Sequence, residues 1–233
     1  MTTDPHTHLY ALTTANSRGV PIDYTDVIAN SSVYLWGFQL ELTDGKLYQS
    51  PEDLSNNSHW TYSATVTADA AVNPVDGAMT ADKLEKSASG NGPGSRLQNI
   101  TLVAGQTYIH SVYLKNINAS TSRLTSWNNN ANAWLGYINI VWAGGLPGAA
   151  PTLTANYGAS NEIAEDVGNG WWRISYRQTT AAGSGLHEHG LTASINSVGT
   201  GLYAYGVQVE LLTPDAKPSP YVPVSRNLFK YPQ

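Results

Sequence analysis

The sequence contains no cysteine, and charged residues make up only 12% of its 233 positions. The missing cysteines exclude disulfides, thiolate catalysis and zinc–cysteine sites. A net charge of −5 without any run of Lys or Arg argues against nucleic-acid binding, which needs a basic stripe. No stretch approaches the roughly 20 apolar residues of a membrane span, and the opening MTTDPHTHLYALTT lacks the basic and apolar regions of a secretory signal. We therefore expect a soluble chain, made in a cytoplasm or cut from a longer protein, with no membrane insertion.

Helical periodicity is nearly absent as well. Only ASNEIAEDVG, residues 159–168, is expected to form a turn or two of helix. Strand-like runs instead recur between clusters of turn residues, a spacing typical of a β-sandwich or barrel. These runs cover residues 60–68, 78–86, 96–103, 106–116, 133–143, 170–180, 190–197 and 201–212. The chain is long enough to bury a sizeable core as one all-β domain.

One stretch near each end of the chain repeats the same pattern. YLWGFQLE, residues 34–41, and YAYGVQVE, residues 203–210, both alternate bulky and small residues and share Gly-x-Gln-x-Glu. Period-two alternation with large residues on one side predicts a half-buried β-strand, and two such strands suggest a duplicated element. In the first copy the apolar face carries Tyr34, Trp36, Phe38 and Leu40.

Aromatic residues are the best candidates for binding. The sequence has 14 Tyr and 7 Trp but only 2 Phe, so most of its aromatic rings carry a polar edge. Sugar rings stack their C–H faces on such rings while Asn, Arg or Asp side chains take the hydroxyls. The candidates are Trp127, Trp134 and Tyr137 in SWNNNANAWLGYINIVW, and Trp171 with Arg173 in WWRISYR.

Strand alternation sorts these candidates by face. It places Trp134 with Trp142 on the core face of strand 133–143, and Tyr137 with Asn139 on the opposite, exposed face. It places Trp172, Ile174 and Tyr176 in the core, and Trp171 with Arg173 and Arg177 on an exposed polar platform. Trp36 and Trp60 are assigned to structure. The alternative is that every one of these rings packs inside the sandwich.

Catalytic and metal-binding patterns are weak. Glu162, Glu165 and Asp166 are close in sequence, but we interpret them as a solvated acidic turn and expect no enzymatic activity. His187 and His189 would point to one face of a strand and could reach one metal ion. Their surroundings, however, are typical of a loop or strand end, where exposed histidines are common, so we expect no metal and no cofactor.

Five ordered blocks resemble a known module. They are LYQSPEDLSNNSHW (47–60), NPVDGAMTADKLE (73–85), GQTYIHSVYLK (105–115), GNGWWRIS (168–175), and YAYGVQVE followed by YVPV (203–224). In this order they resemble a β-sandwich module of bacteriophage and prophage virion proteins, especially tail fibres and adhesins, related to jelly-roll carbohydrate-binding modules. The resemblance implies an antiparallel jelly-roll sandwich. Such modules often hold a structural calcium ion, but no Asp-rich loop near Asp53, Asp76 or Asp82 supports one here.

The resemblance also implies a domain organisation and a role. We expect an N-terminal arm over 1–46 with a partial repeat strand at 33–42, the module over 47–224, and a C-terminal tail over 225–233. The strand at 33–42 needs a sheet to complete, which a second copy could supply by strand addition. Both a segment of a tandem array and a short protein whose arms pair with other copies fit this pattern. Because the sequence begins with Met, we expect the short protein, with a trimer as the expected oligomer.

The expected function is that of a non-catalytic virion protein, made in the host cytoplasm, which serves as a tail fibre, adhesin or surface decoration. Its expected partners are other virion proteins, copies of itself and a host-surface polysaccharide. The alternatives are a carbohydrate-binding module of a secreted polysaccharide-degrading enzyme and a purely structural assembly subunit.

Overall fold

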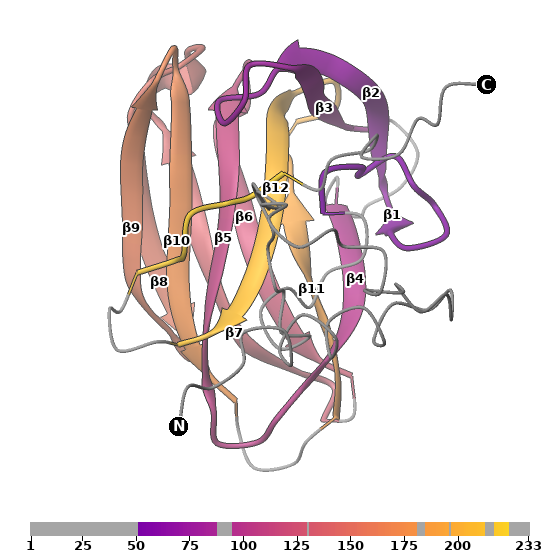
Figure 1. Ribbon diagram of the computed structural model, residues 1–233, viewed down its shortest axis with the longest axis vertical. Helices are drawn as coiled ribbons and strands as arrows, with labels where there is room; N and C mark the ends of the chain where they lie inside the picture. The colour runs from indigo at the N-terminus through magenta and orange to yellow at the C-terminus, as the bar shows by residue number, and fades with distance from the viewer. Residues whose placement is uncertain are drawn as a thin grey trace, which may run out of the picture. The chain divides into compact units, whose positions relative to one another are not determined.

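The computed structural model describes residues 51–87, 95–129, 131–180, 185–195, 197–212 and 217–223. The predicted arm, its strand with Tyr34, Trp36, Phe38 and Leu40, and the tail 225–233 lie outside the described residues. The described chain forms two six-stranded sheets in which every pairing is antiparallel (Figure 1).

The first sheet has the strand order β1-β4-β11-β6-β7-β8. Its strands are β1 (Thr61–Tyr62), β4 (Ser95–Leu102), β11 (Gly185–Thr192), β6 (Thr121–Asn128), β7 (Ala133–Trp142) and β8 (Pro151–Tyr157). The second sheet has the order β2-β3-β12-β5-β10-β9. Its strands are β2 (Ala64–Val72), β3 (Met79–Lys86), β12 (Gly201–Leu211), β5 (Thr107–Asn116), β10 (Trp171–Thr179) and β9 (Ala159–Gly168). A short 3₁₀ turn, η2 (Ala143–Gly145), follows β7.

This topology confirms the predicted jelly roll. The chain changes sheet between β1 and β2, β3 and β4, β4 and β5, β5 and β6, β8 and β9, β10 and β11, and β11 and β12. The resulting central quartets, β3-β12-β5-β10 and β4-β11-β6-β7, have the interleaved order of a jelly roll made of two Greek keys.

The core lies between the two sheets and is built from the alternate residues of their strands. Trp142, Ile174 and Tyr176 are buried there as predicted, and Trp60 is buried beside them. Trp172 is half-buried and packs against the same cluster. Period-two alternation therefore predicted the core faces of β10 and of the second half of β7 correctly.

The prediction for residues 159–168 was wrong, because they form β9 rather than a helical turn. β9 is an edge strand that pairs with β10 along most of its length, with two register irregularities. Glu162, Glu165 and Asp166 therefore lie on a strand and not in an acidic turn. Backbone pairing with β10 outweighs the weak helical preference of this stretch.

Residues 51–60 are attached to the sandwich through buried polar contacts. The Asp82 carboxylate accepts hydrogen bonds from the backbone N–H of Leu54 at 2.7 Å and of Asp69 at 3.0 Å. Burial raises the pKa of Asp82 to about 6 in spite of these bonds. The Pro51 carbonyl accepts a hydrogen bond from the Val207 N–H at 3.1 Å.

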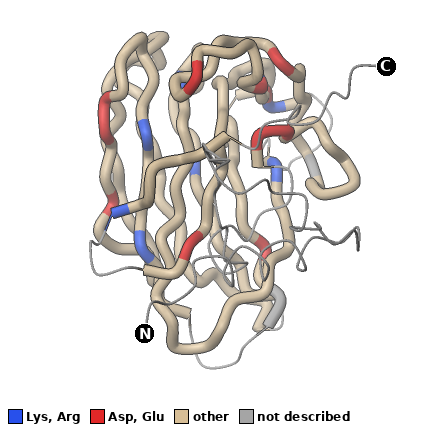
Figure 2. The backbone as a smooth tube through the Cα atoms, in the orientation of Figure 1, with Lys and Arg blue, Asp and Glu red and all other residues tan. Residues whose placement is uncertain are grey.

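Charged side chains are sparse on this scaffold. In Figure 2 the basic residues lie apart from one another along several strands, without a continuous stripe across the described residues. Within the described part of the chain, no helix has the length and apolar character needed to cross a membrane.

Candidate functional site

A bulge in β7 moves Trp134 to the outer face of the first sheet. Ser126 on β6 pairs with Gly136, but the next residue, Trp127, pairs with Trp134, so Leu135 is an extra residue. A bulge shifts the alternation of side chains by one position. Trp134 therefore lies across from Trp127 and half-buried, and its predicted place on the core face with Trp142 was wrong.

Four aromatic side chains meet on this face and form what we call the aromatic platform, namely Trp127, Trp134, Tyr137 and Tyr157. The ring centroids of Trp127 and Trp134 are 4.9 Å apart with planes at 86°. Those of Trp134 and Tyr137 are 5.2 Å apart at 68°, and those of Tyr137 and Tyr157 are 5.4 Å apart at 51°. Edge-to-face pairs of this kind hold each ring in place. Three of the predicted binding residues are thus brought together from two strands.

Tyr157 is the platform residue that sequence reasoning missed. It is 70% exposed and has a φ of +56°, at the end of β8 where the chain turns through Gly158 into β9. The Gly158 N–H donates to the Leu135 carbonyl at 2.9 Å, so the turn is fixed to the bulge of β7. The only signal in the sequence is a Tyr-Gly pair at the end of a strand.

Polar groups flank the platform. The Arg123 guanidinium lies over the Tyr137 ring, with Cζ 4.2 Å from the centroid, and its Nε donates to Asn139 Oδ1 at 2.9 Å. Glu188 on β11 pairs in register with Trp127, and burial raises the pKa of its carboxyl. Beside it, Asn129 Nδ2 donates to Asn99 Oδ1 at 2.9 Å. The platform therefore offers apolar ring faces between hydrogen-bonding groups.

Trp171 and Arg173 do not belong to this site. Both lie on β10 in the second sheet, and they are only 3% and 8% exposed. Trp171 packs in a cluster with Ala81, Tyr113, Tyr205 and Tyr221, so it presents no ring face to a sugar. The predicted exposed platform of Trp171 and Arg173 was wrong, because residues 217–221 and the tyrosines of neighbouring strands cover this face.

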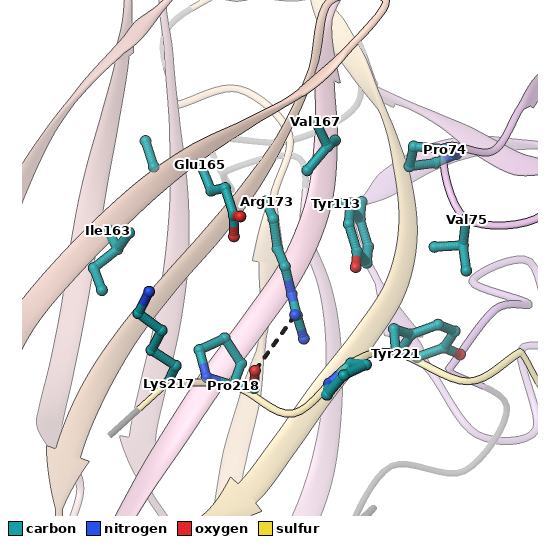
Figure 3. A pocket seen from close by; sticks show the side chains of 12 residues that line it. Pro74, Val75, Tyr113, Ile163, Glu165, Val167, Arg173, Lys217, Pro218 and Tyr221 are labelled. Atoms are coloured by element: carbon teal, nitrogen blue, oxygen red, sulfur yellow. Dashed lines mark hydrogen bonds between the residues drawn. The ribbon is translucent and has the colours of Figure 1, made fainter. Parts of the chain in front are cut away.

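Residues 217–221, here called the strap, are held by the outer face of the second sheet (Figure 3). Arg173 donates to Gln208 Oε1 at 3.0 Å and to the backbone carbonyls of Pro218 and Ser219. Glu210 accepts from the Ser219 N–H and hydroxyl, both at 2.6 Å. The strap borders a groove of about 700 Å³, into which Glu165 and Lys217 point. Because Arg173 already forms hydrogen bonds with the strap, the groove is a weaker candidate for ligand binding than the aromatic platform.

The repeated Gly-x-Gln-x-Glu pattern is explained by this strap. Gly206 has a φ of +62°, and a Cβ there would lie 3.1 Å from the Tyr221 ring, so glycine is needed for both reasons. Gln208 and Glu210 bind Ser219, and the Tyr221 hydroxyl donates to Glu52 at 2.9 Å. In β12 the three residues thus fasten the C-terminal segment, a role that strand alternation alone did not predict.

The histidines lie in the core rather than on an exposed loop. His187 and His189 face the sandwich interior from β11, and the His189 ring stacks on His110 of β5 at 4.7 Å. His110 also stacks on Tyr176 at 4.6 Å. The prediction of exposed histidines was wrong because β11 is a central strand with these residues on its core face. Among the residues that the structure describes, no group of three or more acidic or histidine side chains is placed to hold a metal ion.

Burial controls the protonation of this cluster. It lowers the pKa of His110 to about 3. It also lowers the pKa of His189 well below the ordinary value, with further contributions from His110 and His187. His110 Nε2 and His189 Nδ1 have no hydrogen-bond partner. Both rings are therefore neutral at pH 7.

Several solved structures match part of this chain. No protein-family profile and no curated protein matches the sequence. The enzymatically active domain of tailspike protein 4 from bacteriophage CBA120 is similar over 71% of this chain and 21% of its own, with 16% identity and a TM-score of 0.44. An arabinose-bound α-L-arabinofuranosidase is similar over 75% of this chain and 28% of its own, with 11% identity and a TM-score of 0.47. A xylan-binding domain from Paenibacillus barcinonensis is similar over 66% of this chain and 86% of its own, with 12% identity and a TM-score of 0.33.

Proposed function

We propose that this chain is a non-catalytic, glycan-binding component of a bacteriophage virion, acting as a tail fibre, receptor-binding adhesin or surface decoration. The observation that carries the glycan-binding part is the aromatic platform. Its four rings come from β6, β7 and the end of β8 and are flanked by Arg123, Glu188 and asparagines. The virion part is supported by the five ordered sequence blocks.

The platform has the chemistry that a sugar requires. The faces of Trp and Tyr rings carry partial negative charge, and the C–H faces of a pyranose carry partial positive charge, so the two attract when stacked. One end of the platform offers hydrogen-bond donors and acceptors for hydroxyl groups, from Asn99, Asn129 and Glu188. The other end offers them from Arg123 and Asn139. Arg123 and Trp127 are four residues apart on β6, about 13 Å, which suits a short oligosaccharide better than a single ring.

A binding role fits the carboxylates better than hydrolysis does. Glycosidases place two carboxyl groups on either side of the bond that is cleaved. Among β4, β6, β7, β8 and β11, the strands that form the platform face, Glu188 is the only acidic residue. A ligand on the platform would therefore meet one carboxyl group and be held without cleavage.

Within the virion, we propose that the chain forms a homo-oligomer, with a trimer as the expected state, and that residues 33–42 pair with another copy. The other partners would be virion proteins and a host-surface polysaccharide. The protein would be made in the host cytoplasm and act on the particle. A light-scattering mass for the full chain, compared with a chain in which Trp36 and Phe38 are replaced by Asp, tests the assembly: the oligomer is expected to dissociate only in the variant.

Truncating a platform ring is expected to weaken glycan binding at least tenfold, because each ring supplies a stacking face. The test is an array of bacterial surface polysaccharides probed with the wild type, Tyr157→Ala and Trp134→Ala. Tyr157 is 70% exposed, so its removal should leave the fold intact. Met79→Ala is the matched control, because Met79 is an exposed apolar residue of the second sheet.

Two outcomes would contradict this function. Binding that persists in both platform variants would place the glycan elsewhere on the protein. Failure of the wild type to bind any polysaccharide, together with dissociation of the oligomer in Tyr157→Ala, would make the platform an interface between subunits.

A further inference from the structure

The Arg123 guanidinium is held in place without a carboxylate partner in the described part of the chain. The Tyr137 ring supports its flat face and Asn139 fixes its Nε, so the orientation of the group is set before any ligand arrives. Among the described residues, no acceptor binds its two terminal nitrogens and no carboxylate pairs with it. A planar, oriented pair of N–H donors matches the two oxygens of a carboxylate or sulfate.

We infer that the platform takes an anionic saccharide, whose carboxylate or sulfate group binds Arg123 while neighbouring sugar rings stack on Trp134, Tyr137 and Tyr157. This inference rests on the proposed glycan-binding function. It specifies the class of sugar and the end of the platform at which the anionic group lies.

The other charges on the protein do not oppose this arrangement strongly. Glu188 pairs in register with Trp127, four residues along β6 from Arg123, so it lies about 13 Å from the anion site. That distance exceeds the Debye length of about 8 Å at physiological salt, and repulsion is largely screened.

The two ends of the platform therefore differ in chemistry. Arg123 and Asn139 form a cationic end that fits an acidic group. Glu188, Asn99 and Asn129 form an end that fits hydroxyl groups, since a carboxylate and amides accept and donate hydrogen bonds to them. An acidic saccharide is thus expected to bind in one direction along β6 and β7.

Four saccharides test this inference by calorimetry: a galacturonic-acid trisaccharide, its methyl ester, the neutral galactose trisaccharide and a sulfated disaccharide. The wild type is expected to bind the acidic trisaccharide at least tenfold more tightly than its methyl ester at low salt, with the difference shrinking as salt is added. Arg123→Gln should abolish the difference. Arg123→Lys should keep part of it, because the charge remains without the two-pronged geometry.

The outcomes separate this inference from the proposed function. Equal binding of the acid and its methyl ester would overturn the anionic preference and leave the glycan function intact. No binding of any of the four saccharides at millimolar concentration, together with no binding to any polysaccharide on the array, would overturn both. Tight binding of the sulfated sugar alone would assign the site to sulfate rather than carboxylate. Arg177→Gln, on β10 of the other sheet, is the matched control and should behave as the wild type.

Discussion

Lowering the pH from 6.5 to 4.5 is expected to destabilise the folded chain through His110 and His189. Both are buried between the sheets and have lowered pKa values, so the folded state resists protonation that the unfolded state accepts. A lowered folded pKa means that stability is complete above the unfolded value of about 6.5 and declines as the pH falls toward the folded value. For His110, whose folded pKa is about 3, this decline extends to about pH 3.

The size of this effect is a large share of the stability of a domain. His110 alone is expected to cost on the order of 1 kcal/mol per pH unit below 6.5, or roughly 2–3 kcal/mol at pH 4.5. His189 adds a cost of the same sign. Asp82 acts in the opposite direction, because its pKa is raised to about 6 and the folded state gains stability as this carboxyl is protonated. The gain from Asp82 is about 2 kcal/mol between pH 6 and 4.5. It is smaller than the combined loss from His110 and His189, so the folded chain should still lose stability overall.

His110→Phe isolates the contribution of this histidine. Phenylalanine can keep the stacked contact with Tyr176 and has no ring nitrogen to leave without a partner. Urea unfolding at several pH values should show a slope that is smaller than in the wild type by on the order of 1 kcal/mol per pH unit. The matched control is Val112→Ala, two residues along the core face of β5, which should lower stability by about 2 kcal/mol at every pH. An unchanged slope in His110→Phe would contradict the buried neutral state of this histidine.

Arg173→Met is expected to release the strap and to cost about 3 kcal/mol. The guanidinium joins Gln208 to the carbonyls of the strap, and methionine keeps much of its length but none of its donors. Hydrogen bonds from a charged group to buried acceptors contribute about 1.5–3 kcal/mol each, and the acceptors are left unpaired when the donor is removed. Urea unfolding and the rate of chymotrypsin cleavage after Tyr221 measure the two effects.

The cleavage rate is the more specific measurement. Tyr221 is 4% exposed, so cleavage requires local opening of the strap. A loss of about 3 kcal/mol should raise the open population roughly a hundredfold. Arg177→Met removes a half-buried arginine from the same strand and should accelerate cleavage after Tyr221 little. Equal acceleration in both variants would show that Arg173 does not hold the strap specifically.

The period-two alternation of apolar residues predicted most of the sandwich, because this alternation depends only on which side chains are buried. It identified the fold class and the core faces of β10 and of the second half of β7. It was wrong for the first half of β12, where an irregularity between Tyr205 and Gln208 leaves Tyr205 on the outer face and Leu202 and Ala204 in the core. It was wrong where pairing between strands changes the alternation, as at the bulge around Leu135 that moves Trp134 to the outer face. It was also wrong at β9, where the hydrogen bonds of β10 decide the conformation of a sequence with weak local preference.

The candidate binding residues were also predicted correctly where alternation is regular and wrongly where contacts between distant segments decide the burial. Tyr137 was predicted correctly on the outer face, because alternation in this part of β7 is regular. The contact between Trp127 and Trp134 depends on the bulge at Leu135, which alternation does not predict. Trp171 and Arg173 were predicted as exposed, and they are buried because a distant segment, residues 217–221, crosses their face. Tyr157 and His110 were missed, since each joins its cluster only through contacts between strands far apart in the sequence.

The indole N–H signals of the seven tryptophans provide the most direct test of the aromatic platform as a glycan site. They would be recorded by NMR as oligosaccharides released from the bound surface polysaccharide are added. We predict that the signals of Trp127 and Trp134 shift with the same affinity, while those of the buried Trp60, Trp142 and Trp171 stay in place. Shifts confined to Trp171 and Trp172 in the second sheet, with Trp127 and Trp134 unchanged, would contradict the platform as the binding site.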